Sequence, residues 1–323
     1  MGDSSSADYK PEWLELEKAL GTRPLLVGDS ANIEEQFNGL VAALNAQRPP
    51  PDTSVQTRDA SADGVPVRIY TPSSNASQSG ELPLGVYFHG GGYCVGDLDS
   101  EDVWCRFIAK SVPCVIVSVE YRLGPKHKVP VMLDDSVKAF EWAYTHASEL
   151  HASASQLFTI GGSAGGGLAL TVAHDLIAAG KRSQIKGIVA MVPVAAHPSS
   201  IPASYKNHYQ SYDENAHGVP IIDADTMNTF FGAVGADPQD PRVFVTLSKH
   251  LEEFPPTYIA TCGKDPLRDD GKVLEMMLKD KGIKTKSNYY EGVPHYFWLF
   301  PGIKGGDEFL DDVSKGVKFV LGI

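Results

Sequence analysis

Gly161-Gly162-Ser163-Ala164-Gly165 is the most informative segment of this sequence. It follows an apolar run at 157–160 that reads as a buried strand, and it opens a predicted helix over 164–179. A serine at a sharp strand-to-helix turn has a strained backbone, so small residues around it are needed to avoid clashes. The turn exposes the hydroxyl and leaves the Ala164 amide at a helix N-terminus, which stabilises an oxyanion. Ser163 is therefore the candidate nucleophile.

A second glycine-rich segment, His89-Gly90-Gly91-Gly92-Tyr93, directly follows the predicted strand over 84–88. Its glycines leave main-chain amides unobstructed, and such amides can donate to a carbonyl oxygen that becomes negative during nucleophilic attack. Each segment alone has a plainer explanation, a phosphate-binding or closely packed turn for the first and a flexible turn for the second. No Lys followed by Ser or Thr completes a phosphate loop here. The two segments together predict an oxyanion site beside a nucleophile.

Apolar runs alternate with helical patterns along most of the chain. The expected strands are at 84–88, 114–119, 157–161, 185–192, 257–261 and 284–290, and the expected helices are near 99–111, 131–150, 164–179, 269–281 and 306–321. Two further runs, 53–59 and 65–71, flank the turn signal Asp63-Gly64 and predict an antiparallel hairpin. This alternation predicts an α/β fold, with a mostly parallel central sheet of about eight strands flanked by helices.

Two parts of the sequence depart from the alternation. Residues 1–50 contain two helical patterns before any strand, and residues 195–232 are rich in Tyr, His, Asn and Pro with one short helical candidate at 223–231. We expect 195–232 to be an insertion that forms a small helical cap over the active face, with residues 1–50 contributing to it. The catalytic core then consists of 51–194 and 233–323. A Ser-rich stretch at 73–80 is expected to be a solvated loop.

These motifs resemble the hormone-sensitive-lipase-like branch of the α/β-hydrolases, esterases and lipases marked by an H-G-G-G loop and a G-x-S-A-G elbow. Residues 120–127 look like the branch's Y-R-L-A-P-E-H segment, and residues 265–271 match its D-P-L-R-D-E-G segment closely. The resemblance implies an α/β-hydrolase fold and a triad whose histidine lies in an H-x-F context. The residues that it implies are Ser163, Asp265 and His295 for the triad, and Gly91, Gly92 and Ala164 for the oxyanion hole.

Reasoning from the residues agrees with this assignment. Asp265 and His295 each follow a predicted strand, so both are expected at carboxyl ends of strands, on the nucleophile's edge of the sheet. A free serine hydroxyl is a weak nucleophile, so His295 must take its proton, while Asp265 fixes the imidazole tautomer. Asp269 and Asp270 remain alternatives for the acid, although we expect them on the following helix.

Other residues carry weaker signals. His89 is expected to order its own loop by hydrogen bonding rather than to transfer protons. Gly162 stands where many relatives have Asp, which could loosen the elbow. The insertion also holds side chains that could touch substrate, namely His197, His208 and His217, and an aromatic cluster that either lines a substrate pocket or packs the cap, namely Tyr205, Tyr209, Tyr212, Phe230 and Phe231.

Charge and composition narrow the range of partners. The 40 acidic and 28 basic residues among 323 give a net charge of −12 at pH 7, which disfavours nucleic acid. No apolar run approaches the roughly 20 residues that a membrane anchor needs. The polar residues 1–10 lack the features of a secretory signal, and the four cysteines are scattered without metal-ligand spacing. We therefore predict a cytoplasmic protein without metal or organic cofactor; a homodimer stays open.

The predicted function is a serine carboxylic-ester hydrolase that cleaves short-to-medium acyl esters, or a small-metabolite ester or lactone, through an acyl-enzyme. One alternative is a non-hydrolytic lyase or dehydratase of secondary metabolism on the same fold, and the intact Ser163 argues against it. The other is a small-molecule receptor similar to the plant gibberellin receptor. His295 argues against the receptor, since that protein has lost its catalytic histidine.

Overall fold

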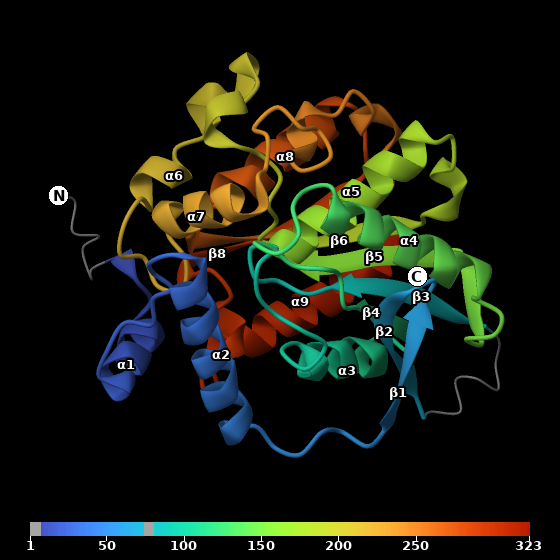
Figure 1. Cartoon of the computed structure of the whole chain (residues 1–323), viewed down its shortest axis with the longest axis horizontal. Helices are drawn as coiled ribbons and strands as arrows, with labels where there is room; N and C mark the ends of the chain where they lie inside the picture. The colour runs from blue at the N-terminus through green and yellow to red at the C-terminus, as the bar shows by residue number, and fades with distance from the viewer. Residues whose placement is uncertain (1–7, 74–80) are drawn as a thin grey trace.

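An eight-stranded sheet forms the centre of the fold, in the order β1-β2-β4-β3-β5-β6-β7-β8 (Figure 1). The strands are β1 (Val55–Ala62), β2 (Val65–Pro72), β3 (Leu82–Phe88), β4 (Val115–Val119), β5 (Ala152–Gly162), β6 (Gly187–Met191), β7 (Thr257–Lys264) and β8 (Thr285–Pro294). The computed structural model describes residues 8–73 and 81–323. The expectations for residues 1–7 and for 74–80 of the Ser-rich stretch lie outside this range.

Strand pairing follows the sequence expectation. β1 and β2 form the antiparallel hairpin around Asp63-Gly64, β2 also pairs antiparallel with β4, and β3 to β8 are joined by parallel ladders. Asp63 and Gly64 both have positive φ, +50° and +96°, as a tight hairpin turn requires. The predicted α/β architecture with a mostly parallel sheet is confirmed.

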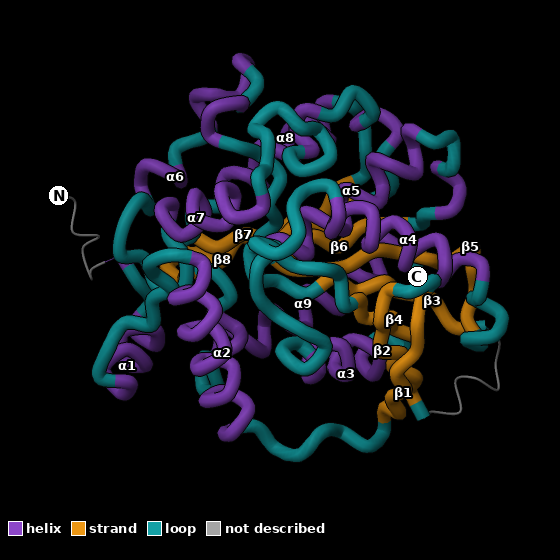
Figure 2. Tube along the Cα trace, in the orientation of Figure 1, coloured by secondary structure: helices purple, strands orange, loops and turns teal. Residues whose placement is uncertain are grey.

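Helices cover both faces of the sheet (Figure 2). They are α1 (Pro11–Leu20), α2 (Ser30–Gln47), α3 (Asp102–Ser111), α4 (Val131–Thr145), α5 (Ala164–Ala178), α6 (Ser211–Glu214), α7 (Ala224–Val234), α8 (Arg268–Asp280) and α9 (Lys304–Leu321). Figures 1 and 2 place α4, α5 and α8 on one side of the sheet and α3 and α9 on the other. No helix in the described ranges combines the length and the apolar character needed to cross a bilayer.

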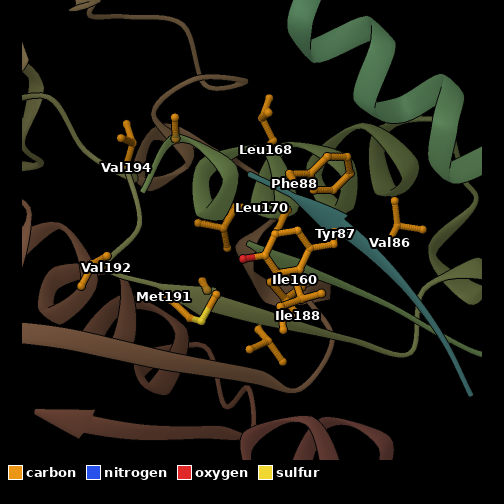
Figure 3. Close-up of a cluster of buried hydrophobic side chains, with 14 of the residues drawn as sticks. Val86, Tyr87, Phe88, Ile160, Leu168, Leu170, Ile188, Met191, Val192 and Val194 are labelled. Atoms are coloured by element: carbon orange, nitrogen blue, oxygen red, sulfur yellow. The ribbon is translucent and has the colours of Figure 1, made fainter. Parts of the chain in front are cut away.

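A cluster of buried apolar side chains lies where β3, β5 and β6 meet α5 (Figure 3). Every residue of β3 and of β6 is buried, because helices cover both faces of these parallel strands. Tyr87, Ile160, Leu170 and Ile188 are each at most 1% exposed. The continuous apolar runs of the sequence, without polar alternation, reflect this two-sided burial. The core thus gives a rigid support to the turn that carries Ser163.

The N-terminal segment packs against the insertion between β6 and β7. The Leu26 amide donates to the Ile221 carbonyl at 3.0 Å, the Ile221 amide donates to the Pro24 carbonyl at 2.7 Å, and the two segments form a parallel bridge. The Thr226 hydroxyl donates to the Leu26 carbonyl at 2.7 Å. Figure 1 accordingly shows α2 beside α7 at one end of the sheet. We call residues 24–47 and 195–234 the cap.

The insertion contains more helix than the single candidate predicted at 223–231. That candidate is α7, and the insertion also contains α6 and two 3₁₀ segments, Pro198–Ser200 and Ala203–His208. These short pieces have no 3.6-residue apolar period, because 3₁₀ turns and single helical turns bury no continuous stripe. Sequence periodicity therefore could not reveal them.

Two adjacent carboxylates of α8 hold the start and the middle of the insertion. One oxygen of Asp270 accepts from the Ala195 and Ala196 amides at 3.0 and 2.9 Å, and the other accepts from the Tyr209 hydroxyl at 2.7 Å. Asp269 accepts from the Gln210 and Ser211 amides in the same way. Because Asp270 is fully buried, its pKa is raised to about 8 in spite of its three donors.

This buried acid predicts a pH-dependent stability. Between the ordinary pKa of 3.8 and the folded-state pKa of about 8, the folded protein keeps a proton on Asp270 that the unfolded chain has released. The free energy of unfolding therefore falls as pH rises through this window. Asp270→Asn keeps the shape and the acceptor oxygen but does not titrate. We expect the Tm of the wild type to fall more steeply than that of the variant between about pH 5 and pH 8, and equal slopes would contradict the assignment.

Candidate active site

The turn between β5 and α5 holds Ser163 in a strained conformation. Its φ of +55° and ψ of −122° are rare for a non-glycine residue, and such strain costs about 1–3 kcal/mol. The Ser163 amide donates to the Met191 carbonyl at 2.9 Å, while its carbonyl accepts from Gly167 and Val194 at 3.0 and 3.1 Å. These bonds hold the turn, and only 4% of the serine is exposed.

Glycines on both sides of Ser163 are required by backbone contacts. A Cβ at Gly161 would lie 2.4 Å from the Gly165 carbonyl oxygen, and a Cβ at Gly165 would lie 2.0 Å from the Phe88 carbonyl oxygen. Backbone oxygens of a buried helix and a buried strand cannot move aside as a flexible side chain would. The elbow therefore needs small residues around the nucleophile, as predicted, because it lies close to the backbone of β3.

The turns after β7 and β8 bring an acid to a histidine. Asp265 Oδ2 lies 2.7 Å from His295 Nδ1, and Asp265 Oδ1 accepts from the Leu267 amide at 2.8 Å. Asp265 is fully buried and His295 is 2% exposed. Because the carboxylate accepts at Nδ1, the neutral imidazole leaves Nε2 as a proton acceptor. Asp269 and Asp270, the alternatives for the acid, lie on α8 and bond to the insertion instead.

The predicted oxyanion loop faces the same cavity. Gly91, Gly92, Ser163 and His295 all line it. The two glycines have φ of +110° and +59°, and a Cβ at Gly91 would lie 2.1 Å from the Val95 carbonyl oxygen. Within the described chain, the amides of Gly91, Gly92 and Ala164 donate to no other protein group. They are therefore available to a substrate oxygen.

His89 orders the oxyanion loop. Its Nδ1 lies 2.7 Å from the Gly90 carbonyl oxygen, and its ring stacks on Tyr121 with centroids 4.3 Å apart. The Tyr121 hydroxyl donates to the His89 carbonyl at 2.8 Å. Burial lowers the pKa of His89 to about 4, so the ring is neutral near pH 7. These contacts agree with the expected loop-ordering role.

The cap supplies most of the apolar wall of the cavity. Its wall residues are Leu26, Phe37, Leu40, Val41, Ile221, Ile222 and Phe230, joined by Leu299. Phe230 lies directly over the oxyanion loop, since a Cβ at Gly92 would be 2.2 Å from its ring. Of the five aromatic residues expected to line a pocket or pack the cap, Phe230 alone is among these wall residues.

The other insertion residues singled out from the sequence have different partners. Tyr209 bonds to Asp270 and Tyr205 to Asp280. Phe231 packs against Phe244, as does His197, with centroids 5.2 and 5.1 Å apart. The remaining three, Tyr212, His208 and His217, do not line the cavity either.

Two residues beside the candidate triad, Tyr296 and Glu101, were not singled out from the sequence. A Cβ at Gly162 would lie 2.0 Å from the Tyr296 hydroxyl oxygen, so this hydroxyl fills the space beside the elbow that a side chain at 162 would need. The same hydroxyl donates to Glu101 at 3.1 Å. The space beside Gly162 is therefore filled, and a looser elbow stays a prediction. Only the tyrosine in the H-x-F motif could have suggested a compensating side chain.

No group of three or more His, Cys, Asp or Glu side chains in residues 8–73 and 81–323 is arranged to hold a metal ion. The chemistry that this geometry supports is acyl transfer by the serine. Ser163 is the nucleophile candidate, His295 the base, Asp265 its partner, and free amides face the same space.

Comparisons with known proteins agree with this geometry. A family model described as the alpha/beta hydrolase fold matches residues 85–299. A versiconal hemiacetal acetate esterase of Dothistroma septosporum is 39% identical over 315 residues, 97% of this chain and 95% of the relative. The crystal structure of vibralactone cyclase has a TM-score of 0.87 at 26% identity, over 100% of this chain and 97% of that one. The structure of an esterase of Pyrobaculum calidifontis has a TM-score of 0.80 at 28% identity, over 96% of this chain and 98% of that one. The chain therefore belongs to the α/β-hydrolase fold family, in its hormone-sensitive-lipase-like branch.

Proposed function

We propose that this chain is a serine hydrolase acting on carboxylic esters. The observation that carries the proposal is the convergence of three distant segments on one cavity. The strained Ser163 lines it together with His295, which is bonded to Asp265 at 2.7 Å, and with the glycines of the oxyanion loop. Relatives named as esterases support the same activity.

The reaction proceeds through an acyl-enzyme. Ser163 Oγ attacks the ester carbonyl while His295 Nε2 takes the hydroxyl proton, and the carbonyl oxygen becomes negative between the amides of Gly91, Gly92 and Ala164. His295 then returns the proton to the leaving alkoxide, and the alcohol departs. A water molecule, deprotonated by His295, attacks the acyl-enzyme; the bond to Ser163 Oγ then breaks, His295 returns the proton to this oxygen, and the carboxylic acid leaves. Asp265 stabilises the imidazolium that forms twice in the cycle.

We infer that the substrate carries a small acyl group on an apolar alcohol. Phe230 covers the oxyanion loop closely, which restricts the space beside the reacting carbonyl, while leucine, isoleucine and phenylalanine side chains of the cap surround the rest. Two relatives, 39% and 34% identical, are named versiconal hemiacetal acetate esterases. We infer short-to-medium acyl esters, an acetylated small metabolite or a lactone as the substrate class.

A panel of p-nitrophenyl esters from acetate to palmitate tests this proposal. We expect kcat/KM to be highest for acetate or butyrate and to fall at least about 10-fold by the longest soluble chain, because each extra methylene meets the Phe230 side of the cavity. A fluorophosphonate probe should label the protein, with the adduct mapped to Ser163 by mass spectrometry. Activity confined to long emulsified esters would indicate a lipase instead, and no labelling would reject the serine mechanism.

One observation favours a second candidate, a non-hydrolytic acyl transfer on the same site. The similarity to a structure named vibralactone cyclase spans the whole chain. If a hydroxyl within the substrate attacked the acyl-enzyme in place of water, the product would be a lactone and no acid would be released. Mass spectrometry of the products from a hydroxyacyl ester, in H₂¹⁸O, separates the two candidates. Hydrolysis places ¹⁸O in the acid, whereas cyclisation leaves the lactone unlabelled.

We also propose a cytoplasmic location. Cys94, Cys105, Cys114 and Cys262 are all free and buried, a pattern typical of proteins in a reducing compartment. Cell fractionation with compartment markers tests the location.

A homodimer stays open, and light scattering on the purified chain would show it.

A further inference from the structure

Glu101 is a buried acid beneath the oxyanion loop. It lies directly before α3, is 7% exposed, and borders the cavity of Ser163. Its Oε1 accepts from the Gly90 amide at 2.9 Å and from the Tyr296 hydroxyl at 3.1 Å, and its Oε2 accepts from the Tyr87 hydroxyl. One carboxyl group thus receives three neutral donors, two from the end of β3 and the loop directly after it and one from the turn after β8.

Two of these donors belong to the candidate catalytic loops. Gly90 immediately precedes the oxyanion glycines, and Tyr296 immediately follows His295. The Tyr296 hydroxyl also reaches the elbow, because a Cβ at Gly162 would lie 2.0 Å from it and a Cβ at Gly90 would lie 2.5 Å from it. The hydroxyl therefore lies among the oxyanion loop, the histidine turn and the serine elbow, and its hydrogen bond is to Glu101.

Glu101 also completes the restraint of Gly90. The Gly90 amide donates to Glu101, while the Gly90 carbonyl oxygen lies 2.7 Å from His89 Nδ1. The glycine is thus held on both sides, and the Gly91 and Gly92 amides follow it directly. Since the value of an oxyanion hole depends on donors fixed before the reaction, this restraint bears on the transition state more than on substrate binding.

Burial of a carboxyl group at this position costs free energy. Burial raises the pKa of Glu101, although the bonds from Tyr87, Gly90 and Tyr296 and the more distant charge of Arg48 act in the opposite direction. Within the described residues, no Lys, Arg or His forms a direct ion pair with it. An apolar side chain of similar volume would avoid this cost of burial, but it would leave three buried donors without an acceptor. The acceptor oxygens are therefore the property that the site requires.

We propose that Glu101 is a positioning residue for the oxyanion step, acting through Gly90 and Tyr296 to hold the oxyanion loop against the histidine turn and the serine elbow. This role rests on the proposed ester hydrolysis and adds a residue to it. Glu101 transfers no proton, so an uncharged acceptor of the same shape can replace it.

Glu101→Leu and Glu101→Gln form the test pair. The leucine removes both acceptor oxygens, and we expect kcat for p-nitrophenyl acetate to fall about 10²-fold with KM within about 3-fold. The glutamine oxygen can accept from Gly90 and Tyr296 while its amide group donates to the Tyr87 oxygen, so we expect kcat within about 5-fold of wild type. Thermal melts confirm that each variant is folded at the assay temperature.

A trifluoromethyl ketone, which forms an anionic adduct with the serine, reports on the oxyanion site directly. Its inhibition constant should rise in Glu101→Leu by the same factor by which kcat/KM falls, because both depend on the loop amides. Tyr87→Phe is the matched control, since it removes a donor to the same carboxyl group from a strand residue outside the catalytic loops. We expect Tyr296→Phe to lower kcat about 10-fold and Tyr87→Phe less than about 3-fold.

Wild-type kcat and inhibitor affinity in Glu101→Leu would overturn the role. Equal losses in Tyr87→Phe and Tyr296→Phe would overturn it too, since they would indicate general support of the core; this comparison decides the question even if the leucine variant does not fold. Failure of the proposed hydrolysis itself has a different signature. In that case Ser163→Ala would hydrolyse the ester as fast as the wild type.

Discussion

Ser163→Ala is expected to lower kcat for p-nitrophenyl acetate at least about 10³-fold. In the proposed mechanism, the Ser163 hydroxyl is the group that forms the acyl-enzyme. Among the described residues, no other serine, threonine or cysteine lines the cavity with His295 except Ser100, whose hydroxyl donates to the Asp97 carbonyl. The remaining rate would come from water that attacks the ester directly, while the oxyanion amides still stabilise the transition state. Fluorophosphonate labelling should be lost together with the activity.

The fold should survive this change. Alanine is smaller than serine, the strained φ of +55° is the same for both, and the bonds that hold the turn come from the main chain of Ser163. We therefore expect the Tm of the variant to lie at or slightly above the wild-type value, as happens when a strained functional site is simplified. Undiminished hydrolysis by a correctly folded Ser163→Ala protein would remove Ser163 from the mechanism.

Asp265→Asn is expected to lower kcat about 10³- to 10⁴-fold with little change in fold. The remaining oxygen of the new amide can still accept from the Leu267 amide, which directs its NH₂ group toward His295 Nδ1. An NH₂ group needs an acceptor there, so the imidazole proton moves to Nε2. In that tautomer the nitrogen that should take the serine proton is already occupied.

Asp270→Asn is the matched control for the acid. It lies on the neighbouring helix, was an alternative in the same motif, and bonds to the insertion rather than to His295. We expect its kcat at pH 7 to stay within about 3-fold of wild type. Kinetics of both variants on one ester, at several pH values, make the comparison. If Asp270→Asn lost as much activity as Asp265→Asn, the assignment of the acid would be wrong.

Local sequence was informative wherever one chemical requirement dominated a short segment. Parallel strands buried on both faces must be apolar throughout, so β3, β4 and β6 could be recognised as continuous runs. The elbow must avoid the backbone of β3, which restricts Gly161 and Gly165 to glycine. The hairpin needs positive φ at Asp63 and Gly64. These constraints act between neighbours in the chain or between a strand and the adjacent turn.

The 3₁₀ segments of the insertion and the polar contacts of its tyrosines could not be recognised in this way. Tyr209 was a candidate pocket residue from its type, yet its hydroxyl is bonded to Asp270 on α8, 61 positions away. Composition alone cannot tell a pocket wall from a packed cap, because both consist of aromatic and aliphatic side chains. Phe230 lines the cavity and Phe231 packs against Phe244, because α7 points the two rings in different directions.

The α/β architecture and the position of Ser163 follow from the order of residues along the chain, because local sterics and burial restrict which residues can occupy such turns. Asp265 and His295 were assigned through the family resemblance and their positions after predicted strands. Other features required the folded chain: which acid meets His295, which cap side chains close the cavity, and that Tyr296 and Glu101 join the catalytic loops. Glu101 and Tyr296 are 195 positions apart, and a hydrogen bond between them is an outcome of packing that no local pattern encodes.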